Sequence, residues 1–294
     1  MIDVSIVIVN YNTKQVTLDC IRSVKEKSQN LSYEIVLVDN ASTDGTAEAV
    51  ASEFGDVLVI RCSENIGFGR ANNRGVEQAK GKYIFFLNSD TLLVNNAVKL
   101  LLDFAEHHPA INVMGGLLYW KDGGENGSCG FFGGYFSRIM WLLGKTVRSN
   151  LVYTSKQKRM FEADGYMYVD YVVGAHMFCQ REYFNRFGGF DPEFFMYCEE
   201  EDLQKRMTDA GGKIVLVNGP KIIHLINASM QKKTSFFSKC CRLKSMLYYM
   251  RKHHSSASFA VFKQVVFAIE WLKSFKGVYS KNEYKDVFRM IRNA

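Results

Sequence analysis

The chain is predicted to be an α/β protein with a mostly parallel, twisted sheet flanked by helices, followed by a helical C-terminal extension. Short apolar runs rich in β-branched and aromatic residues, typical of buried strands, recur at residues 5–9, 34–38, 57–61 and 83–87. Helical periodicity lies between them, at residues 14–27, 46–54 and 69–79, with Thr13 and Asp44 placed to cap the first two helices. This alternation favours right-handed βαβ units, which build a parallel sheet.

Length and charge divide the chain into two parts. With 294 residues, 47% of them hydrophobic, it has room for one large domain, expected at residues 1–230, and a smaller region at 231–294. The smaller region carries 14 Lys and Arg against 3 Asp and Glu, whereas residues 1–230 carry 23 against 27. The net charge of +7 is therefore a property of the tail, which favours an anionic partner, either nucleic acid or a membrane leaflet.

Cysteine usage and hydropathy indicate a cytoplasmic protein. The seven cysteines are odd in number and form no Cys-x-x-Cys pair, which is typical of free thiols in a reducing compartment. The first apolar run is too short for the hydrophobic part of a signal peptide. No stretch approaches the roughly 18 consecutive apolar residues of a membrane-spanning helix.

Polar or glycine-rich turns follow all four predicted strands. Such a sheet binds ligands at the carboxyl ends of its strands, so these turns share the edge where a ligand is expected. Asn, Asp and Gly are also ordinary turn residues, and that reading suffices for any single turn. Four such turns in succession favour a binding site; they are Asn10-Tyr11-Asn12, Asp39-Asn40, Asn65-Ile66-Gly67-Phe68-Gly69 and Asn88-Ser89-Asp90.

Two of these turns place a carboxylate near a buried strand. Asp90 would lie in a low dielectric, where a divalent metal shared with a diphosphate would keep it ionised. The alternative is that Asp90 caps a helix starting near Thr91. Asp39 has no partner nearby in sequence and is placed to accept hydrogen bonds from a base or ribose.

The second half of the chain is less regular. Residues 120–164 are rich in glycine and aromatic residues, which predicts a long excursion with a short helix that covers a site or receives an acceptor. A helix is expected from about Glu199, and a closing pair of strands at 213–217 and 221–225. The tail is predicted to be helical, with one apolar face at positions 243, 246, 247 and 250 and another at positions 261, 265, 268, 269 and 272.

The sequence resembles the family 2 glycosyltransferases over most of its length. The likeness runs from Val4 to about Ser229 and is most similar to the rhamnosyltransferase-like bacterial branch that builds surface polysaccharides. It is carried by residues 5–12, 38–45, 65–69 and 87–90, quoted in part above. The resemblance implies a GT-A fold, an inverting reaction, a dTDP- or UDP-linked sugar donor, Mg²⁺ or Mn²⁺, and a saccharide or polyprenyl-linked acceptor. It divides the large domain into a donor half at about 1–116 and an acceptor half at about 117–230.

The resemblance also implies roles for the turn residues. Asn10 and Asn12 would line the nucleotide pocket and Asp39 would contact the base. Asn65 and Arg70 would lie toward the ribose or phosphate. Asp90 would bind the metal, and Asn88 stands where the family's first metal-binding Asp is expected, so that ligand would be weaker or water-mediated.

A second set of residues belongs to the acceptor half by the same resemblance. Residues 194–203 match an aromatic stretch followed by an acidic pair, whose second member is the general base. By register this is Glu200, where the family usually has Asp, with Glu199 as the neighbouring candidate and Asp202 left open. His224 would bind metal or phosphate, and Gly174 and Ala175 would lie beside the acceptor with help from Asp170. Alternatively, the acidic run only favours the helix dipole and His224 is structural.

Other functions fit the sequence less well. A Rossmann oxidoreductase would need glycines in the first strand-to-helix turn, which has none. A P-loop is absent, which argues against a P-loop nucleotide-binding protein. The absence of a Gln-x-x-Arg-Trp motif argues against a processive polysaccharide synthase. The remaining alternative is a non-catalytic module that binds sugar nucleotides or nucleic acid, although we expect no nucleic-acid partner. We expect the basic, aromatic tail to lie peripherally on the anionic inner leaflet of the membrane. Packing of those aromatic residues on the large domain is the alternative.

Overall fold

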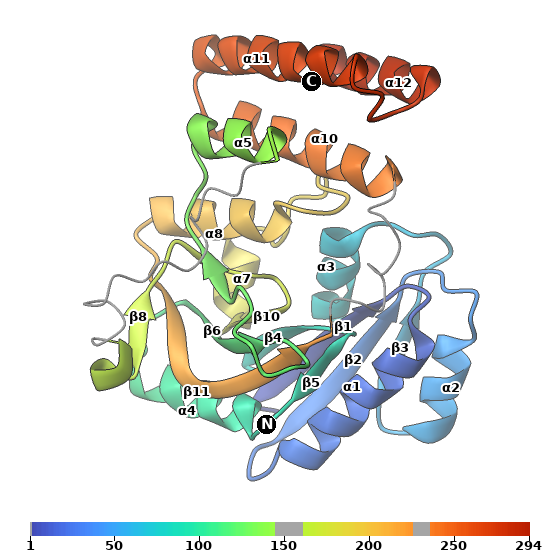
Figure 1. Ribbon diagram of the computed structural model, residues 1–294. Helices are drawn as coiled ribbons and strands as arrows, with labels where there is room; N and C mark the ends of the chain where they lie inside the picture. Colours follow the sequence, from blue (N-terminus) through green and yellow to red (C-terminus); the bar gives the residue numbers. More distant parts are fainter. Residues whose placement is uncertain (1, 145–160, 226–235) are drawn as a thin grey trace.

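A mixed sheet forms the centre of the computed structural model, which describes residues 2–144, 161–225 and 236–294 (Figure 1). Among these residues the sheet has nine strands in the order β3-β2-β1-β4-β10-β6-β11-β5, with β8 paired to β11. β1 to β4 are mutually parallel, β11 runs parallel to β6, and β10 runs antiparallel to both β4 and β6. The strands are β1 Val4–Asn10, β2 Tyr33–Asp39, β3 Leu58–Arg61, β4 Tyr83–Asn88, β5 Thr91–Leu93, β6 Val113–Tyr119, β8 Tyr166–Tyr168, β10 His176–Gln180 and β11 Ile214–His224.

Helices cover both faces of the sheet, so the strands bury side chains on both sides. In β1, Ile6 and Ile8 join a core with α1 and α4, whereas Val7 joins the opposite core with α3, α7 and α8. This alternation is the period-two geometry of a strand, and the apolar runs in the sequence reflect burial of both faces. The helices are α1 Lys14–Lys27, α2 Thr46–Glu53, α3 Phe68–Gln78, α4 Ala97–His107, α7 Arg181–Arg186 and α8 Glu199–Asp209.

The C-terminal helices form a further layer beyond α8 (Figure 1). In this layer α5 lies beside α10, and the helices α11 and α12 are outermost. They share a third apolar core with Phe194, which precedes α8. Apolar burial therefore joins the C-terminal region to the segment that leads into α8. The elements are β7 Cys129–Gly130, β9 Tyr171–Val172, α5 Tyr135–Leu142, α10 Phe236–His253, α11 Ser256–Ser274 and α12 Lys281–Asn293.

Three local predictions were wrong. The expected strand pair at 213–225 is one strand, β11, whose register against β6 shifts between Leu216 and Lys221. The Thr13 side chain does not cap α1; the Lys14 amide is instead 2.9 Å from the Asp44 carboxylate, which approaches from the loop before α2. The face expected on α11 is mostly exposed, since that helix buries Phe259, Phe262, Val266 and Ile269.

None of the described helices is both long enough and apolar enough to cross a membrane. The described part of the excursion agrees with the prediction of a short helix, α5, although residues 145–160 lie outside the described ranges. None of the seven cysteines, all of which lie in the described ranges, takes part in a disulfide, which agrees with the prediction from the sequence.

Candidate functional site

A pocket of about 380 Å³ opens between the carboxyl end of β4 and the beginning of α8. It brings together residues from both halves of the large domain that lie far apart in the sequence. Seven of the residues predicted to form the site line it: Asn88, Asp90, Gly174, Ala175, Glu199, Glu200 and His224.

Strand pairing brings His224 to Asp90. β4 ends at Asn88, and the chain re-enters the sheet at Thr91, which pairs with His224 across the β5–β11 ladder. His224 Nε2 is then 3.2 Å from Asp90 Oδ1 and 3.4 Å from Asn88 Nδ2. Because a strand begins at Thr91, the alternative of Asp90 as a helix cap is excluded.

These three side chains suit a divalent cation that is shared with a diphosphate. Asn88 Oδ1 is buried and has no hydrogen-bond partner among the described residues, which leaves an oxygen ligand beside the Asp90 carboxylate. The described residues hold no group of three or more His, Cys, Asp or Glu side chains placed for a metal. Mg²⁺ commonly takes one or two protein carboxylates and completes its shell with phosphate and water, so a sparse protein ligand set fits.

On the donor edge, Asn10 bonds to other protein groups. Its side chain is fully buried, and its Nδ2 donates to Asp39 Oδ1 at 3.0 Å and to Ser42 Oγ at 2.8 Å. The hydroxyls of Thr13 and Thr17 donate to its Oδ1. Asn10 therefore fixes the position of Asp39, which the β1–β2 register places directly opposite it.

The other predicted donor residues also bond within the protein. Asn12 Oδ1 accepts from the Thr43 amide at 2.8 Å, and Asn65 Oδ1 accepts from the Gly67 amide at 3.0 Å and from Asn40. Arg70 Nε donates to the Pro192 carbonyl at 2.6 Å, in the turn before α8. These bonds hold the loops of the sheet edge in place.

The turn that begins α8 is conformationally costly. Tyr197 and Cys198 have φ values of 73° and 65°, in the left-handed region that residues with a Cβ seldom adopt. Each such residue typically costs about 1–3 kcal/mol, and such strain clusters at functional sites. Tertiary bonds hold this turn: the Tyr197 hydroxyl lies 2.6 Å from Ser238 Oγ, and Ser245 Oγ donates to the Met196 carbonyl at 2.8 Å.

Glu199 and Glu200 present acidic groups to the pocket. In each of them Oε2 is buried and has no hydrogen-bond partner among the described residues. Burial raises the pKa of Glu199 well above its usual range, and the neighbouring Glu200 charge raises it further. Burial likewise raises the pKa of Glu200. A carboxyl with a raised pKa holds a proton more readily near neutrality, as a general base requires.

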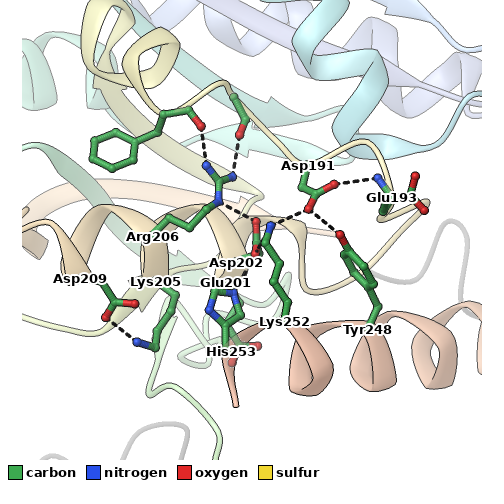
Figure 2. A network of polar contacts seen from close by, with 12 residues as sticks. Asp191, Glu193, Glu201, Asp202, Lys205, Arg206, Asp209, Tyr248, Lys252 and His253 are labelled. Atoms are coloured by element: carbon green, nitrogen blue, oxygen red, sulfur yellow. Dashed lines mark hydrogen bonds and ion pairs between the residues drawn. The ribbon is translucent and has the colours of Figure 1, made fainter. Parts of the chain in front are cut away.

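The next two acidic residues are neutralised by ion pairs. Glu201 pairs with Arg138 of α5. Asp202 is fully buried, and its carboxylate lies 2.9 Å from Arg206 Nε, 2.8 Å from Lys252 Nζ and 2.8 Å from His253 Nε2 (Figure 2). Burial alone would raise the pKa of Asp202, but hydrogen bonds from His253 and Lys252 leave it below the ordinary value. Of the three candidates for the base, only Glu199 and Glu200 line the pocket.

Of the residues predicted on the acceptor side, Gly174 and Ala175 line the pocket and Asp170 does not. A Cβ on Gly174 would meet the Glu200 Cβ at 3.5 Å, so Gly174 packs directly beside the candidate base. The Ala175 carbonyl accepts from the Asn88 amide at 3.0 Å. Asp170 does not line the pocket; its Oδ2 accepts from the Phe132 amide at 2.7 Å. His176 is buried, its Nε2 lies 2.9 Å from the Gly116 carbonyl, and burial lowers its pKa to about 4, which indicates a structural role.

Sequence reasoning missed several residues of the pocket wall. Phe68, Asn126 and Tyr197 line the pocket beside the predicted residues. Phe68 and Tyr197 lie inside the quoted motifs, but both are uncharged and neither was assigned a role. Asn126 lies in the glycine-rich excursion, and the only signal for it was the general prediction that this segment covers a site.

Comparisons with known protein sequences agree with these features. The Glycosyl transferase family 2 model matches residues 5–147. An N-acetylglucosaminyl-diphospho-decaprenol L-rhamnosyltransferase of Mycobacterium tuberculosis is 25% identical over 213 residues, covering 65% of this chain and 66% of the relative. Rhamnosyltransferase WbbL of Escherichia coli is 29% identical over 199 residues, 63% of this chain and 70% of WbbL. The putative teichuronic acid biosynthesis glycosyltransferase TuaG of Bacillus subtilis is 32% identical over 124 residues, which cover 41% of this chain and 49% of TuaG.

Solved structures show the same fold at low sequence identity. GalNAc-T7, crystallised with UDP, GalNAc and Mn²⁺, superposes with a TM-score of 0.66 at 19% identity, over 85% of this chain and 48% of the other. Residues 1–349 of Staphylococcus aureus TarS superpose with a TM-score of 0.54 at 15% identity, over 90% of this chain and 69% of the other. The predicted GT-A fold is confirmed.

Proposed function

We propose that this chain is an inverting, metal-dependent glycosyltransferase of family 2 that acts in surface polysaccharide biosynthesis, because the Glycosyl transferase family 2 model matches residues 5–147 and two of its relatives are named as rhamnosyltransferases. It moves a deoxyhexose such as rhamnose, or a hexose, from a dTDP- or UDP-linked donor to a saccharide or polyprenyl-linked saccharide acceptor. The names of the mycobacterial and E. coli relatives favour rhamnose. The observation that carries the proposal is the pocket in which Glu200 and Glu199 lie with Asp90 and His224.

The pocket supplies both halves of a single displacement. Glu200 removes the proton from the acceptor hydroxyl as its oxygen attacks the anomeric carbon, and the bond from that carbon to the diphosphate breaks. The proton ends on a Glu200 carboxyl oxygen, where burial favours it. The neighbouring Glu201 charge raises the pKa of Glu200 further and so also favours proton uptake.

The donor is held by the sheet edge. Asp39, fixed by Asn10, accepts hydrogen bonds from the base, and Asn88, Asp90 and His224 would hold Mg²⁺ or Mn²⁺ beside the diphosphate. Such an ion, when bound, neutralises charge that develops on the leaving group. Asn12, Asn65 and Arg70 keep the surrounding loops in the shape that admits the nucleotide.

A donor screen with matched variants tests this proposal. We expect purified protein with Mg²⁺ or Mn²⁺ to release or transfer sugar from one of dTDP-rhamnose, UDP-hexoses or UDP-N-acetylhexosamines. Asp90→Ala should abolish that turnover, whereas Asp122→Ala, at an exposed position in another loop, should leave it unchanged. Binding of nucleotide sugars without turnover of any donor would instead indicate a non-catalytic binding module.

We place the enzyme on the inner face of the cytoplasmic membrane, with the large domain at 1–230 and the basic region at 231–294. Trp271 of α11 and Phe275, which follows that helix, are 48% and 71% exposed, and their rings meet edge to face with their centres 4.7 Å apart. Amphipathic surfaces of this kind bind anionic leaflets. A Trp271→Ser, Phe275→Ser variant should float less with anionic liposomes than the parent protein. If the parent protein does not float, the membrane location is wrong.

A further inference from the structure

A second cavity, of about 470 Å³, lies between α5, α10, α11 and α12. The sheet edge contributes no residue to its lining. Nor does the turn at residues 197–200 that begins α8, which we call the acidic turn. It is therefore a separate feature of the C-terminal layer, and we call it the tail groove.

The tail groove is cationic. Lys239, Arg242, Lys273 and Lys276 line it against a single acidic residue, Glu270. Glu270 is buried and pairs through Oε1 with Lys273 at 2.6 Å. The other three cations form no ion pair with any described residue. Three positive charges outside any ion pair favour an anionic ligand.

The same groove has apolar walls. Leu142, Leu243 and Val287 are buried around it, whereas Trp141 and Leu143 remain 42% and 50% exposed. Exposed apolar surface beside unpaired cations is poorly matched to a fully polar ligand such as a nucleotide. An amphiphilic anion, with a phosphate group and a hydrocarbon chain, would satisfy both surfaces.

Arg242 links the tail groove to the Glu200 pocket. Its guanidinium lies 4.4 Å from the centre of the Tyr197 ring and 5.6 Å from that of Trp141. Tyr197 lines the Glu200 pocket, and Trp141 lines the groove. If the phosphate of such an amphiphilic ligand binds at Arg242, it lies at the junction of the Glu200 pocket and the tail groove. A sugar attached to that phosphate would then point toward Glu200, and the hydrocarbon chain would lie in the groove.

The neighbouring chain segments are poor occupants on grounds of charge. Residues 145–160, which follow the groove residue Gly144, contain five Lys and Arg and no Asp or Glu. Residues 226–235 contain two lysines and no acidic residue. Placing either segment in the groove would bring like charges together, which costs free energy.

We propose that the tail groove binds the polyprenyl diphosphate part of a lipid-linked acceptor and delivers its sugar to the Glu200 pocket. This inference rests on the proposed transferase function and assigns one part of the acceptor to one surface. The phosphates lie near Arg242, Lys239 and Lys276, and the isoprenoid chain lies along Trp141 and Leu143.

Direct binding of farnesyl diphosphate to the full-length protein tests the proposal. Calorimetry or tryptophan fluorescence should show binding that Lys276→Glu weakens at least tenfold and that Leu143→Asn also weakens. Lys285→Glu, an exposed charge reversal on α12 outside the groove, should bind as the parent does. Inorganic diphosphate and farnesol should each bind more weakly than farnesyl diphosphate. Equal affinity for inorganic diphosphate, or equal loss in Lys285→Glu, would overturn the proposal.

A second measurement separates this inference from the transferase proposal. Hydrolysis of the donor by water requires no lipid, so Lys276→Glu should retain it while the KM for a lipid-linked acceptor rises about tenfold. If the parent protein turns over a donor but does not bind farnesyl diphosphate, the groove assignment fails alone. If it binds farnesyl diphosphate through the groove but turns over no donor, the transferase function fails. Binding only to vesicles, unaffected by Lys276→Glu, would indicate a membrane surface and would also overturn the groove assignment.

Discussion

Asn10 and Asp39 on the donor edge bond to each other, whereas Glu199 and Glu200 at the start of α8 each keep a buried oxygen without a partner among the described residues. The donor edge is thus a hydrogen-bonded scaffold that is complete before any ligand binds. The acidic turn is held in a state that costs free energy, because a buried carboxyl oxygen without a hydrogen-bond partner is poorly solvated. The contrast supports the proposal that the donor edge recognises the nucleotide and that the turn carries the group that takes the proton.

Other parts of the molecule offset the cost of the acidic turn. Asp202, three residues after Glu199, accepts from Arg206 of its own helix and from Lys252 and His253 of α10 (Figure 2). Lys252 also reaches Asp191 at 2.5 Å, and thereby ties the turn before α8 to the same helix. The C-terminal region therefore holds α8 and the turn before it in place.

The largest expected effect breaks the acidic turn. We expect Glu200→Gln to lower kcat by about 10²–10⁴-fold, because the amide cannot accept the acceptor proton, a step worth that much in other enzymes. The donor Kd should remain within about twofold, since the donor edge is untouched. Steady-state kinetics and donor titration of the same preparation measure both quantities.

Glu199→Gln serves as the matched comparison at the neighbouring carboxyl. Its kcat should fall far less than that of Glu200→Gln, because Glu199 does not take the acceptor proton in the proposed mechanism. If Glu199→Gln collapses turnover and Glu200→Gln does not, the base is Glu199 and the register assignment is wrong.

The second prediction breaks the donor edge. Asp39→Asn keeps an oxygen that can accept from Asn10 but loses the negative charge that favours hydrogen bonds from a base. Hydrogen bonds to charged groups contribute about 1.5–3 kcal/mol, so the donor KM should rise roughly 10–100-fold. Asp19→Asn, on α1 with a side chain that is 42% exposed, should leave the KM unchanged. A fall in kcat with an unaltered donor KM would place Asp39 outside nucleotide recognition.

A smaller effect is expected from weakening the support of the acidic turn. Lys252→Met removes one of the three side chains that bond to buried Asp202, which should lower the free energy of unfolding by about 1–2 kcal/mol. Lys205→Met, which breaks a pair with the largely exposed Asp209, should change it by less than about 0.5 kcal/mol. Urea denaturation measures both changes, and equal effects of the two substitutions would contradict the prediction.

The pH dependence of that support follows from the lowered pKa of Asp202. Its stabilisation is fully present above the ordinary value of 3.8 and is lost as the pH falls through the lower folded value. The difference between the parent protein and Lys252→Met should therefore shrink in strong acid. A difference that grows below pH 3.8 would have the wrong sign.

The fold and much of the pocket were predictable because their signals are local. Asp90 ends an apolar strand, and Glu200 follows an aromatic motif at a fixed distance. The division of the acidic run was not predictable, since the partners that neutralise Asp202 lie on α10, 51 residues away in the case of His253. Likewise, sequence placed Asn10 at the ligand edge but gave no sign that its side chain bonds to Asp39. Long-range hydrogen bonds decide which polar residues stay free, and no local pattern encodes them.

The smallest expected effect is a change in the free energy of unfolding when Glu199 is replaced, which again compares the acidic turn with the donor edge. Because burial raises the pKa of Glu199, the folded state holds its proton more tightly than the unfolded state. That contribution is fully present below the ordinary value of 4.5 and is lost as the pH rises through the raised folded value. Near neutrality Glu199→Gln should therefore be about 1 kcal/mol more stable than the parent, a typical gain at a strained functional site. The gain should vanish below pH 4.5, and urea denaturation at both pH values measures it. A variant destabilised equally at both would show that Glu199 is an ordinary structural residue, like the polar groups of the donor edge.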